Sequence, residues 1–513
     1  MSTLVLRIGT CLALALSLAG CGGGGGSSAP PAPTFTDPVA YSSAATASLP
    51  RADEISAVTH HPLAVNGATI NYTATVGHLT AHGLTSNAPE ASLFYVAYTL
   101  DGASAATRPV TFFYNGGPGS STVWLHLGSY GPKRLVTGDP TTTAPTPFPL
   151  VDNAESLIDV SDLVFVDAVG TGLSEAIAPN VNQTFWSVDA DAAVFRDFVM
   201  RYLAANNRAS SPKFLFGESY GTTRSAVLAN MLESAGISLA GVILQSSALN
   251  YNVACGVILP LIVSCAGDLP SYGAIGAWFN LDNPNPAPSA LPAFIAQMRT
   301  LTADQYDPAV TAFLATGTPP PAALLPQLVS TTGMSLGGWQ THFNMDPDFY
   351  QANLIPGTLI GRYDARVSTP LGSPLASEGD PSSTFINASF ASAITPYLNA
   401  TLQYTNPSSY VLVTNAIRTW DFAHDGQTLP DTVPDLAAAL AQNPQLKVLS
   451  VNGYYDLATP FFQTERDLAR LGPTSNVLLR FYPAGHMTYL DDGSRVLEKA
   501  DLVQFYQSAS AAP

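Results

Sequence analysis

One short segment of the sequence has the spacing expected of a nucleophilic serine. Residues 217–221 read Gly-Glu-Ser-Tyr-Gly, and in the pattern Gly-x-Ser-x-Gly a strand turns sharply into a helix and exposes the serine hydroxyl. Glycine at the outer positions avoids side-chain collisions in this strained turn. The segment follows the apolar residues 214–216 and precedes a helix-forming run. Ser219 is therefore the predicted nucleophile.

A second segment matches the same pattern in a less suitable context. Residues 333–337 read Gly-Met-Ser-Leu-Gly, with Ser335 at the centre. Gly337 and Gly338 follow this serine and would break the helix that the turn requires. We interpret Ser335 as a chance match.

A nucleophilic serine needs a base to accept its proton and an acid to orient that base. Asp456 and His486 each follow an apolar, strand-like run, and they stand in the chain order Ser, Asp, His. His424 precedes Asp456, so its order is wrong. We predict a triad of Ser219, Asp456 and His486.

The same chemistry needs backbone N–H groups that stabilise a developing oxyanion. Residues 115–119 read Asn-Gly-Gly-Pro-Gly and directly follow a strand-like run that ends at Tyr114. We assign the oxyanion hole to the amides of Gly117 and Tyr220. The alternative is a purely structural Gly-Pro turn, which would not explain why the segment occurs together with the serine motif.

Composition and histidine spacing exclude other kinds of chemistry. Acidic residues outnumber basic ones by 37 to 20, and the resulting net charge of −17 disfavours nucleic acid as a partner. His78 and His82 have ligand-like spacing, but they lack helical periodicity and a nearby third ligand. We therefore expect no metal site.

The elements that must position these residues alternate between strands and helices. Helical periodicity is clearest in residues 188–203 and 222–235. The predicted strands are short, apolar or β-branched runs: residues 69–76, 93–100, 109–114, 163–166, 214–216, 241–244, 448–451 and 477–482. This alternation predicts a doubly wound, mostly parallel α/β sheet, here of the α/β-hydrolase fold.

One interval between strands is too long for an ordinary crossover. Residues 51–249 and 445–513 are predicted to form the two parts of the core, separated by residues 250–444. We interpret this segment as a cap inserted over the active site. Its proline-rich pieces, 283–292 and 318–321, favour an irregular lid.

The N-terminus has the features of an export signal. A basic residue and a short apolar run precede Leu-Ala-Gly-Cys at residues 18–21, so residues 1–20 are a predicted signal peptide and Cys21 a predicted lipidation site. An ordinary signal peptide with an incidental cysteine is the alternative. Residues 21–50 are a predicted flexible tether. We expect an exported protein anchored to a bacterial membrane, periplasmic or at the cell surface.

Two further cysteines remain once Cys11 is removed with the signal peptide. Cys255 and Cys265 are ten positions apart, and in an oxidising compartment we interpret them as one local disulfide. A pair of buried free thiols is the alternative.

Taken together, five ordered motifs resemble the serine carboxypeptidase family. They are residues 115–121, 167–174, 217–221, 452–456 and 484–487. The resemblance implies release of the C-terminal residue from peptides, usually at acidic pH, without metal or cofactor. It also implies that Asn115 and Glu218 bind the terminal carboxylate of a peptide substrate. Glu218 could do so only by sharing a proton, since two adjacent carboxylates cannot both stay ionised.

The chain departs from the family at three places. Ser129 stands where the family commonly has a second glutamate, and Phe113 where better-known members have tryptophan. Thr488 and Tyr489 follow the histidine motif in place of the usual proline. Two other functions compete with the peptidase: an esterase or acyltransferase on the same scaffold, and an inactive lipid-anchored binding protein.

Overall fold

A computed structural model describes residues 35–137, 148–257 and 262–510. The signal peptide, Cys21 and residues 22–34 of the expected tether lie outside these residues. None of the described helices is long and apolar enough to span a membrane.

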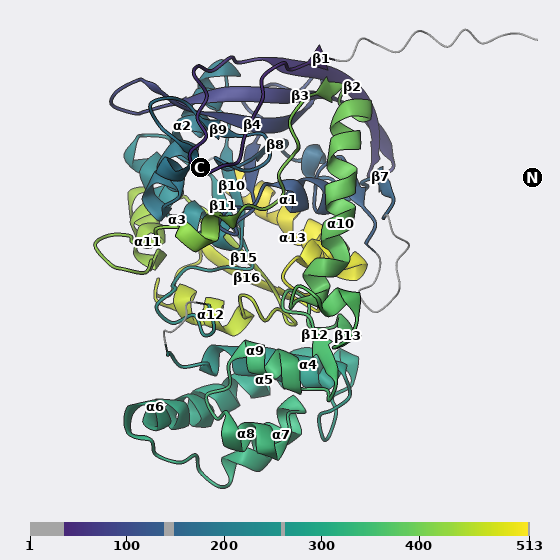
Figure 1. The fold of residues 1–513 in the computed structure, drawn as a ribbon, viewed down its shortest axis with the longest axis vertical. Helices are drawn as coiled ribbons and strands as arrows, with labels where there is room; N and C mark the ends of the chain where they lie inside the picture. Colours follow the sequence, from purple (N-terminus) through teal and green to yellow (C-terminus); the bar gives the residue numbers. More distant parts are fainter. Residues whose placement is uncertain (1–34, 138–147, 258–261, 511–513) are drawn as a thin grey trace, which may run out of the picture. The chain divides into compact units, whose positions relative to one another are not determined.

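A ten-stranded sheet forms the centre of the molecule (Figure 1). Nine of its strands are hydrogen-bonded in the order β16-β15-β11-β10-β5-β8-β4-β3-β2, and β9 pairs with β4. In chain order they are β2 Ser56–Val65, β3 Ala68–His82, β4 Pro89–Leu100, β5 Val110–Tyr114, β8 Asp162–Val166, β9 Glu175–Ala176, β10 Lys213–Glu218, β11 Gly241–Gln245, β15 Lys447–Gly453 and β16 Val477–Tyr482.

The direction of pairing divides the sheet into two halves. From β16 to β8 all neighbouring strands are parallel, whereas β8, β4, β3 and β2 pair antiparallel. The parallel strands are buried along most of their length, as expected for strands covered on both faces. The predicted doubly wound, mostly parallel α/β sheet is confirmed.

Helices cover both faces of the sheet because side chains alternate along each strand. Leu215 points to the face covered by α2 Val188–Ala205, α3 Tyr220–Ser234 and α11 Val433–Gln442. Phe214 and Phe216 point to the opposite face. That face is covered by α1 Val123–Gly128, α10 Pro381–Pro396 and α13 Asp492–Ser510. Two hydrophobic cores result.

Ordered structure begins before Arg51, which corrects the predicted tether of residues 21–50. Strand β1 Phe35–Thr36 pairs in parallel with β14 Tyr404–Thr405. The Asp37 carboxylate is fully buried and accepts hydrogen bonds from the hydroxyl groups of Tyr404 at 2.6 Å and Tyr41 at 3.1 Å. The sequence predicts a tether because residues 21–50 contain few large apolar side chains. Such a count does not detect pairing with a strand far along the chain or hydrogen bonds of a buried carboxylate.

The insertion between β11 and β15 is largely helical, which corrects the expected irregular lid. Its helices are α4 Leu269–Trp278, α5 Leu291–Leu301, α6 Asp307–Thr316, α7 Leu324–Thr332, α8 Leu336–Thr341 and α9 Pro347–Asn353. Pro270, Pro292, Pro308 and Pro347 stand at the first or second helical position. Proline is tolerated there because those N–H groups lack an intrahelical partner. The prolines therefore begin helices instead of disrupting them.

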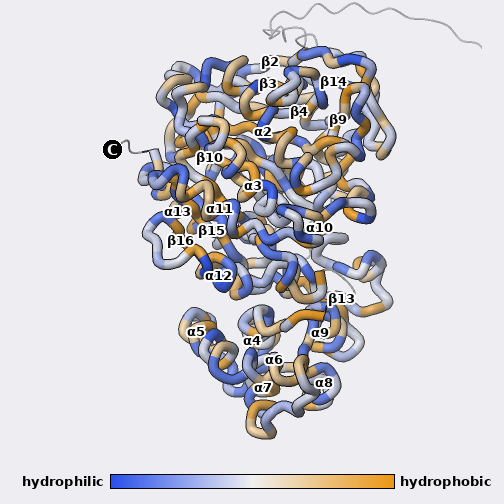
Figure 2. Tube along the Cα trace, turned by 90° about the vertical axis from the view of Figure 1, so that its left-hand side faces the viewer, coloured by the Kyte–Doolittle hydropathy of each residue, from blue (hydrophilic) through white to orange (hydrophobic). Residues whose placement is uncertain are grey.

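Only part of the insertion forms a separate layer. We call residues 266–365 the helical lobe; it has its own apolar core, which includes Tyr272, Tyr306 and Trp339. In Figure 1 its helices α4 to α9 lie together beside the sheet, and Figure 2 shows hydrophobic stretches among them as well as around the central strands. Helices α10 and α11 instead pack on the sheet faces, so the predicted cap of residues 250–444 is too long.

Candidate active site

Ser219 occupies a sharp turn between β10 and α3. Its backbone has φ 59° and ψ −127°, a conformation that L-residues rarely adopt. A side chain on Gly217 would place a Cβ 2.2 Å from the Gly221 carbonyl oxygen, and one on Gly221 would lie 2.9 Å from the Tyr114 carbonyl oxygen. Both outer glycines are therefore needed for the turn, as the sequence pattern indicates.

Asp456 lies in the loop after β15 and is completely buried. Its Oδ1 accepts hydrogen bonds from the amides of Ala458 at 2.7 Å and Thr459 at 3.0 Å. Its Oδ2 accepts from the Thr459 hydroxyl at 2.8 Å and from His486 Nδ1 at 2.7 Å. These donors stabilise the ionised carboxylate and fix its orientation.

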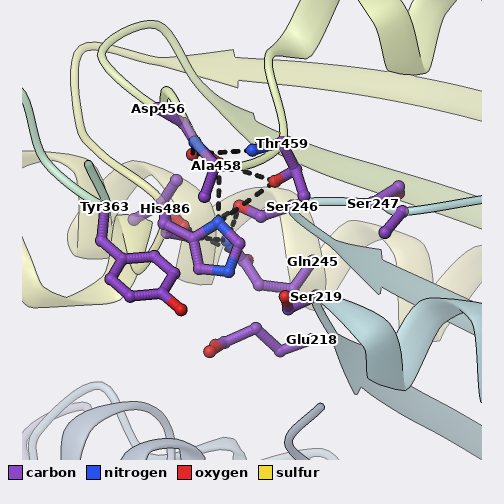
Figure 3. A network of polar contacts seen from close by, with 12 residues as sticks. Glu218, Ser219, Gln245, Ser246, Ser247, Tyr363, Asp456, Ala458, Thr459 and His486 are labelled. Carbon is purple, nitrogen blue, oxygen red and sulfur yellow. Dashed lines mark hydrogen bonds and ion pairs between the residues drawn. The ribbon is translucent and has the colours of Figure 1, made fainter. Parts of the chain in front are cut away.

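His486 follows β16 and is held from several sides (Figure 3). Its carbonyl oxygen accepts hydrogen bonds from Gln245 Nε2 at 2.9 Å and Ser246 Oγ at 2.6 Å, while its amide donates to the Tyr363 carbonyl at 2.6 Å. Burial alone would lower the pKa of His486, but the carboxylates of Asp456, Glu218 and Asp380, with Asp456 the strongest, together raise that pKa. The pair is arranged to stabilise an imidazolium.

The structure brings Ser219 to the side of this pair without a direct bond. The Ser219 amide donates to the Gln245 carbonyl at 2.9 Å, and the Gln245 side chain binds His486. In Figure 3 the His486 ring lies between Asp456 and Ser219, and its second nitrogen faces the serine side. No hydrogen bond joins the Ser219 hydroxyl to His486 among the described contacts; such bonds commonly tighten only when substrate binds.

The loop after β5 lies directly against the serine turn. A Cβ on Gly116 would be 2.5 Å from the Tyr220 nitrogen, so the two backbones touch. Gly117 has φ 105°, which favours glycine. The amides of Gly117 and Tyr220 donate to no other described residue. Two free N–H groups are thus available beside Ser219 for an oxyanion.

A buried arginine on α3 holds the loop after β5 in place. Arg224 on α3 is fully buried and donates from Nη1 to the Asn115 carbonyl oxygen at 2.8 Å. Asp191 neutralises it through two hydrogen bonds of 2.7 and 3.2 Å. Sequence reasoning missed both residues, because their side chains are 33 positions apart in the chain and belong to no motif.

The contact between the loop and the turn gives a testable expectation. In Gly116→Ala the added methyl group would collide with the Tyr220 and Gly221 nitrogens at 2.5 and 2.6 Å, which displaces the oxyanion donors. We expect kcat to fall roughly 10²- to 10³-fold with an unchanged far-UV spectrum. Gly337→Ala is the control, since no atom lies within 4 Å of its Cβ. Equal activity of the two variants would contradict the assignment.

Glu218 and Asn115 form a buried polar pair next to Ser219. Asn115 Nδ2 donates to Glu218 Oε1 at 2.8 Å, and the Tyr489 hydroxyl donates to Oε2 at 2.6 Å. Burial raises the pKa of Glu218 to about 7, against the opposing effects of His486 and these hydrogen bonds. A carboxyl group that is half neutral at pH 7 can share a proton with an incoming carboxylate.

The three departures from the family pattern have structural explanations. Ser129 is buried and donates to the Leu125 carbonyl at 2.5 Å, so its hydroxyl serves the end of α1. Phe113 stacks between Phe165 and Phe216 in the core. Tyr489, by contrast, is a site residue that sequence reasoning missed, although its unusual position after the histidine motif was a usable signal.

The residues set aside on sequence grounds lie elsewhere. Ser335 accepts a hydrogen bond from the Gly338 amide at 3.1 Å and caps α8. His424 bridges Asp435 and Asp189, and the hydrogen bond to Asp435 contributes most to raising its pKa to about 9. His78 is buried and bonded to the Leu173 carbonyl.

Two further expectations concern metal ions and the disulfide. No cluster of three or more His, Cys, Asp or Glu side chains that could hold a metal ion is found in the described part of the chain. The predicted disulfide joins Cys255 and Cys265, whose Cα atoms are 5.1 Å apart.

A strained serine turn at the carboxyl end of a central parallel strand, beside a buried Asp–His pair, defines a serine hydrolase of the α/β-hydrolase fold. The family resemblance is confirmed over part of the chain: a family model described as serine carboxypeptidase matches residues 67–251. This segment includes Asn115, Glu218 and Ser219 and ends before Asp456 and His486.

Several solved structures are similar to this chain at low sequence identity. A proline iminopeptidase from Mycobacterium smegmatis is 14% identical, with a TM-score of 0.38 over 85% of this chain and 99% of that one. A lipase in its open form is 14% identical, with a TM-score of 0.37 over 85% and 98%. A carboxyl esterase from Bacillus coagulans is 13% identical, with a TM-score of 0.35 over 85% and 99%. No curated protein matches the sequence.

Proposed function

We propose that the protein is a serine-type carboxypeptidase that removes the C-terminal residue of peptides through an acyl-enzyme intermediate. One observation carries the proposal. A carboxyl group with a raised pKa, Glu218, immediately precedes the nucleophile and is held by Asn115 and Tyr489. A neutral carboxyl group at this place can donate to the free carboxylate of a substrate and so select peptides by their terminus.

The proposed triad acts in two half-reactions. His486 Nε2 takes the Ser219 proton while the serine oxygen attacks the scissile carbonyl carbon, and the Gly117 and Tyr220 amides stabilise the oxyanion. The protonated imidazole then gives its proton to the leaving amine, so the C-terminal amino acid departs. In the second half-reaction His486 removes a proton from water, whose oxygen attacks the ester on Ser219. The imidazolium then returns the proton to the departing serine oxygen, which frees the shortened peptide and restores the enzyme.

The pH dependence of substrate affinity tests the role of Glu218. Below a pKa of about 7 its carboxyl group is neutral and can share a proton; above that pH it ionises and repels the substrate carboxylate. We expect KM for a free-acid peptide to rise about tenfold per pH unit above pH 7. In Glu218→Gln the rise should disappear, because the amide does not ionise.

Two comparisons make this measurement specific. The same peptide with an amidated C-terminus should show no rise in KM. Glu498 is a second buried carboxyl group whose pKa burial raises to about 7, so Glu498→Gln is the matched control and should keep the rise. A similar pH profile for acid, amide and simple aryl ester would instead support an esterase or acyltransferase.

We also propose that the protein acts outside the cytoplasm, anchored through a lipid on Cys21. The disulfide between Cys255 and Cys265 supports an oxidising compartment. Labelling with a radioactive fatty acid that is lost in Cys21→Ser would test the anchor.

A further inference from the structure

A large pocket opens beside the nucleophile. It has a volume of about 610 Å³, and its wall contains Ser219 and Gly117 together with residues of the helical lobe and of the segment that follows it. We call it the Ser219 pocket. Glu218, Asn115 and Tyr489 are not among the residues that line it.

The wall of the Ser219 pocket is strongly acidic. The carboxylate side chains that line it are Asp268, Asp348, Glu378, Asp380 and Asp467. Among the described lining residues only Arg362 carries a positive charge, and Asp348 already forms an ion pair with it. The remaining four carboxyl groups have no basic side chain in the wall to balance them.

Asp268 is the most unusual of these groups. It is only 2% exposed, and its Oδ1 accepts no hydrogen bond from any described residue. Burial raises the pKa of Asp268 well above its usual value, and Asp346 and Asp456 add to this effect while Arg362 opposes it. An unpaired buried carboxylate is costly, and a cation in contact with it would remove that cost.

Other polar atoms in the wall also lack partners. Asp380 uses Oδ1 to accept hydrogen bonds from the amides of Arg362 and Ser382, both at 2.9 Å, which fixes its orientation. Its Oδ2 is buried without a donor among the described residues, and so is the Ser247 hydroxyl. The pocket therefore offers acceptors that its own wall leaves unused.

We propose that the Ser219 pocket binds a positively charged side chain of the substrate, a lysine or arginine next to the scissile bond, with Asp268 and Asp380 as its carboxylate partners. This inference rests on the proposed peptidase function and specifies its substrate class. An extended organic cation suits the pocket better than a metal ion, because the described carboxylates do not converge into a metal-binding cluster. Two acceptors from separate segments also match the several N–H donors of such a side chain.

Matched peptides test the proposal. Each pair differs only in lysine or its uncharged analogue norleucine, placed either at the C-terminus or one residue before it. We expect kcat/KM to be at least about tenfold higher for lysine at one of these positions. In Asp268→Asn that preference should fall below about threefold.

Control variants distinguish direct contact of Asp268 with the substrate cation from a general effect of the protein's negative charge on the preference for lysine. Asp304 is exposed on the helical lobe, so Asp304→Asn removes the same charge and should keep the full preference. Because Asp268 has an unpaired oxygen, Asp268→Asn should not lower the melting temperature. If it nevertheless fails to fold, Asp380→Asn provides the same test, since its amide oxygen can still accept the bonds from the Arg362 and Ser382 amides.

A binding assay distinguishes failure of this inference from failure of the proposed function. Acetyl-lysine methylamide should slow labelling of Ser219 by a fluorophosphonate more than acetyl-norleucine methylamide does, whether or not peptides are cleaved. Labelling with this selectivity but without peptide cleavage would refute the peptidase and support the cation site. Equal protection by both amides and equal rates for both peptides would overturn the cation site.

Discussion

Replacing Ser219 by alanine should lower kcat by a factor of about 10⁴ to 10⁶ and abolish labelling by a fluorophosphonate. Without the hydroxyl group no acyl-enzyme can form, and only the free Gly117 and Tyr220 amides and substrate binding remain to accelerate hydrolysis. Alanine lacks the hydroxyl but has the same Cβ, so it should tolerate the left-handed turn as well as serine does. Unchanged thermal unfolding would show that the loss is chemical.

Ser335 provides the matched control for this experiment. It stands in the second Gly-x-Ser-x-Gly segment, but its hydroxyl caps α8. Ser335→Ala should keep full labelling and activity and lose about 1 kcal/mol of stability through the missing cap. If labelling persists in Ser219→Ala and disappears in Ser335→Ala, the nucleophile has been assigned wrongly.

Replacing Asp456 by asparagine should reduce kcat about 10⁴-fold while leaving the fold intact. The carboxylate accepts the Nδ1 proton of His486 at 2.7 Å, which leaves Nε2 free to accept the serine proton. The Asn side-chain amide has nearly the same shape, but its NH₂ group would face Nδ1 and favour the tautomer with the proton on Nε2. An imidazole in that form cannot deprotonate Ser219.

The kinetic signature of Asp456→Asn should be specific to catalysis. We expect KM to change little, because Asp456 is fully buried behind the histidine. Asp435→Asn is the control, since Asp435 makes the comparable bond of 2.8 Å to His424, away from the proposed site. Equal losses of activity in both variants would mean that Asp456 acts only through stability.

The site residues that sequence reasoning identified share one property: the strands, turns and helices that position each of them lie next to it in the sequence. The serine turn needs a strand, two glycines and a helix within about a dozen residues, and all are visible in the sequence. Asp456 and His486 likewise follow strands directly. Because parallel strands end at one edge of the sheet, the loops after them come together without further information.

The parts that sequence reasoning missed depend on contacts between distant segments. Gln245 links the Ser219 backbone to His486, which is 241 positions away, and Tyr489 reaches Glu218 across 271 positions. Gln245 belongs to no motif, and the unusual position of Tyr489 after the histidine motif does not reveal that its partner is Glu218. The prediction of an irregular lid is wrong for another reason. Proline disrupts the interior of a helix but is tolerated in its first turn, so proline-rich sequence does not exclude helices.

The junction between the helical lobe and the catalytic loops limits how this enzyme can be redesigned. The amides of Leu457 and His486 donate to the carbonyls of Arg362 and Tyr363, and the Ala365 amide donates to the Tyr455 carbonyl. Both neighbours of the acid, and the base itself, are thus hydrogen-bonded to residues 362–365, which end the lobe. A chimaera in which another lobe replaces this one must therefore keep residues 362–365 of the present chain. Otherwise the exchange would change the substrate selectivity and, at the same time, remove hydrogen bonds that position Asp456 and His486.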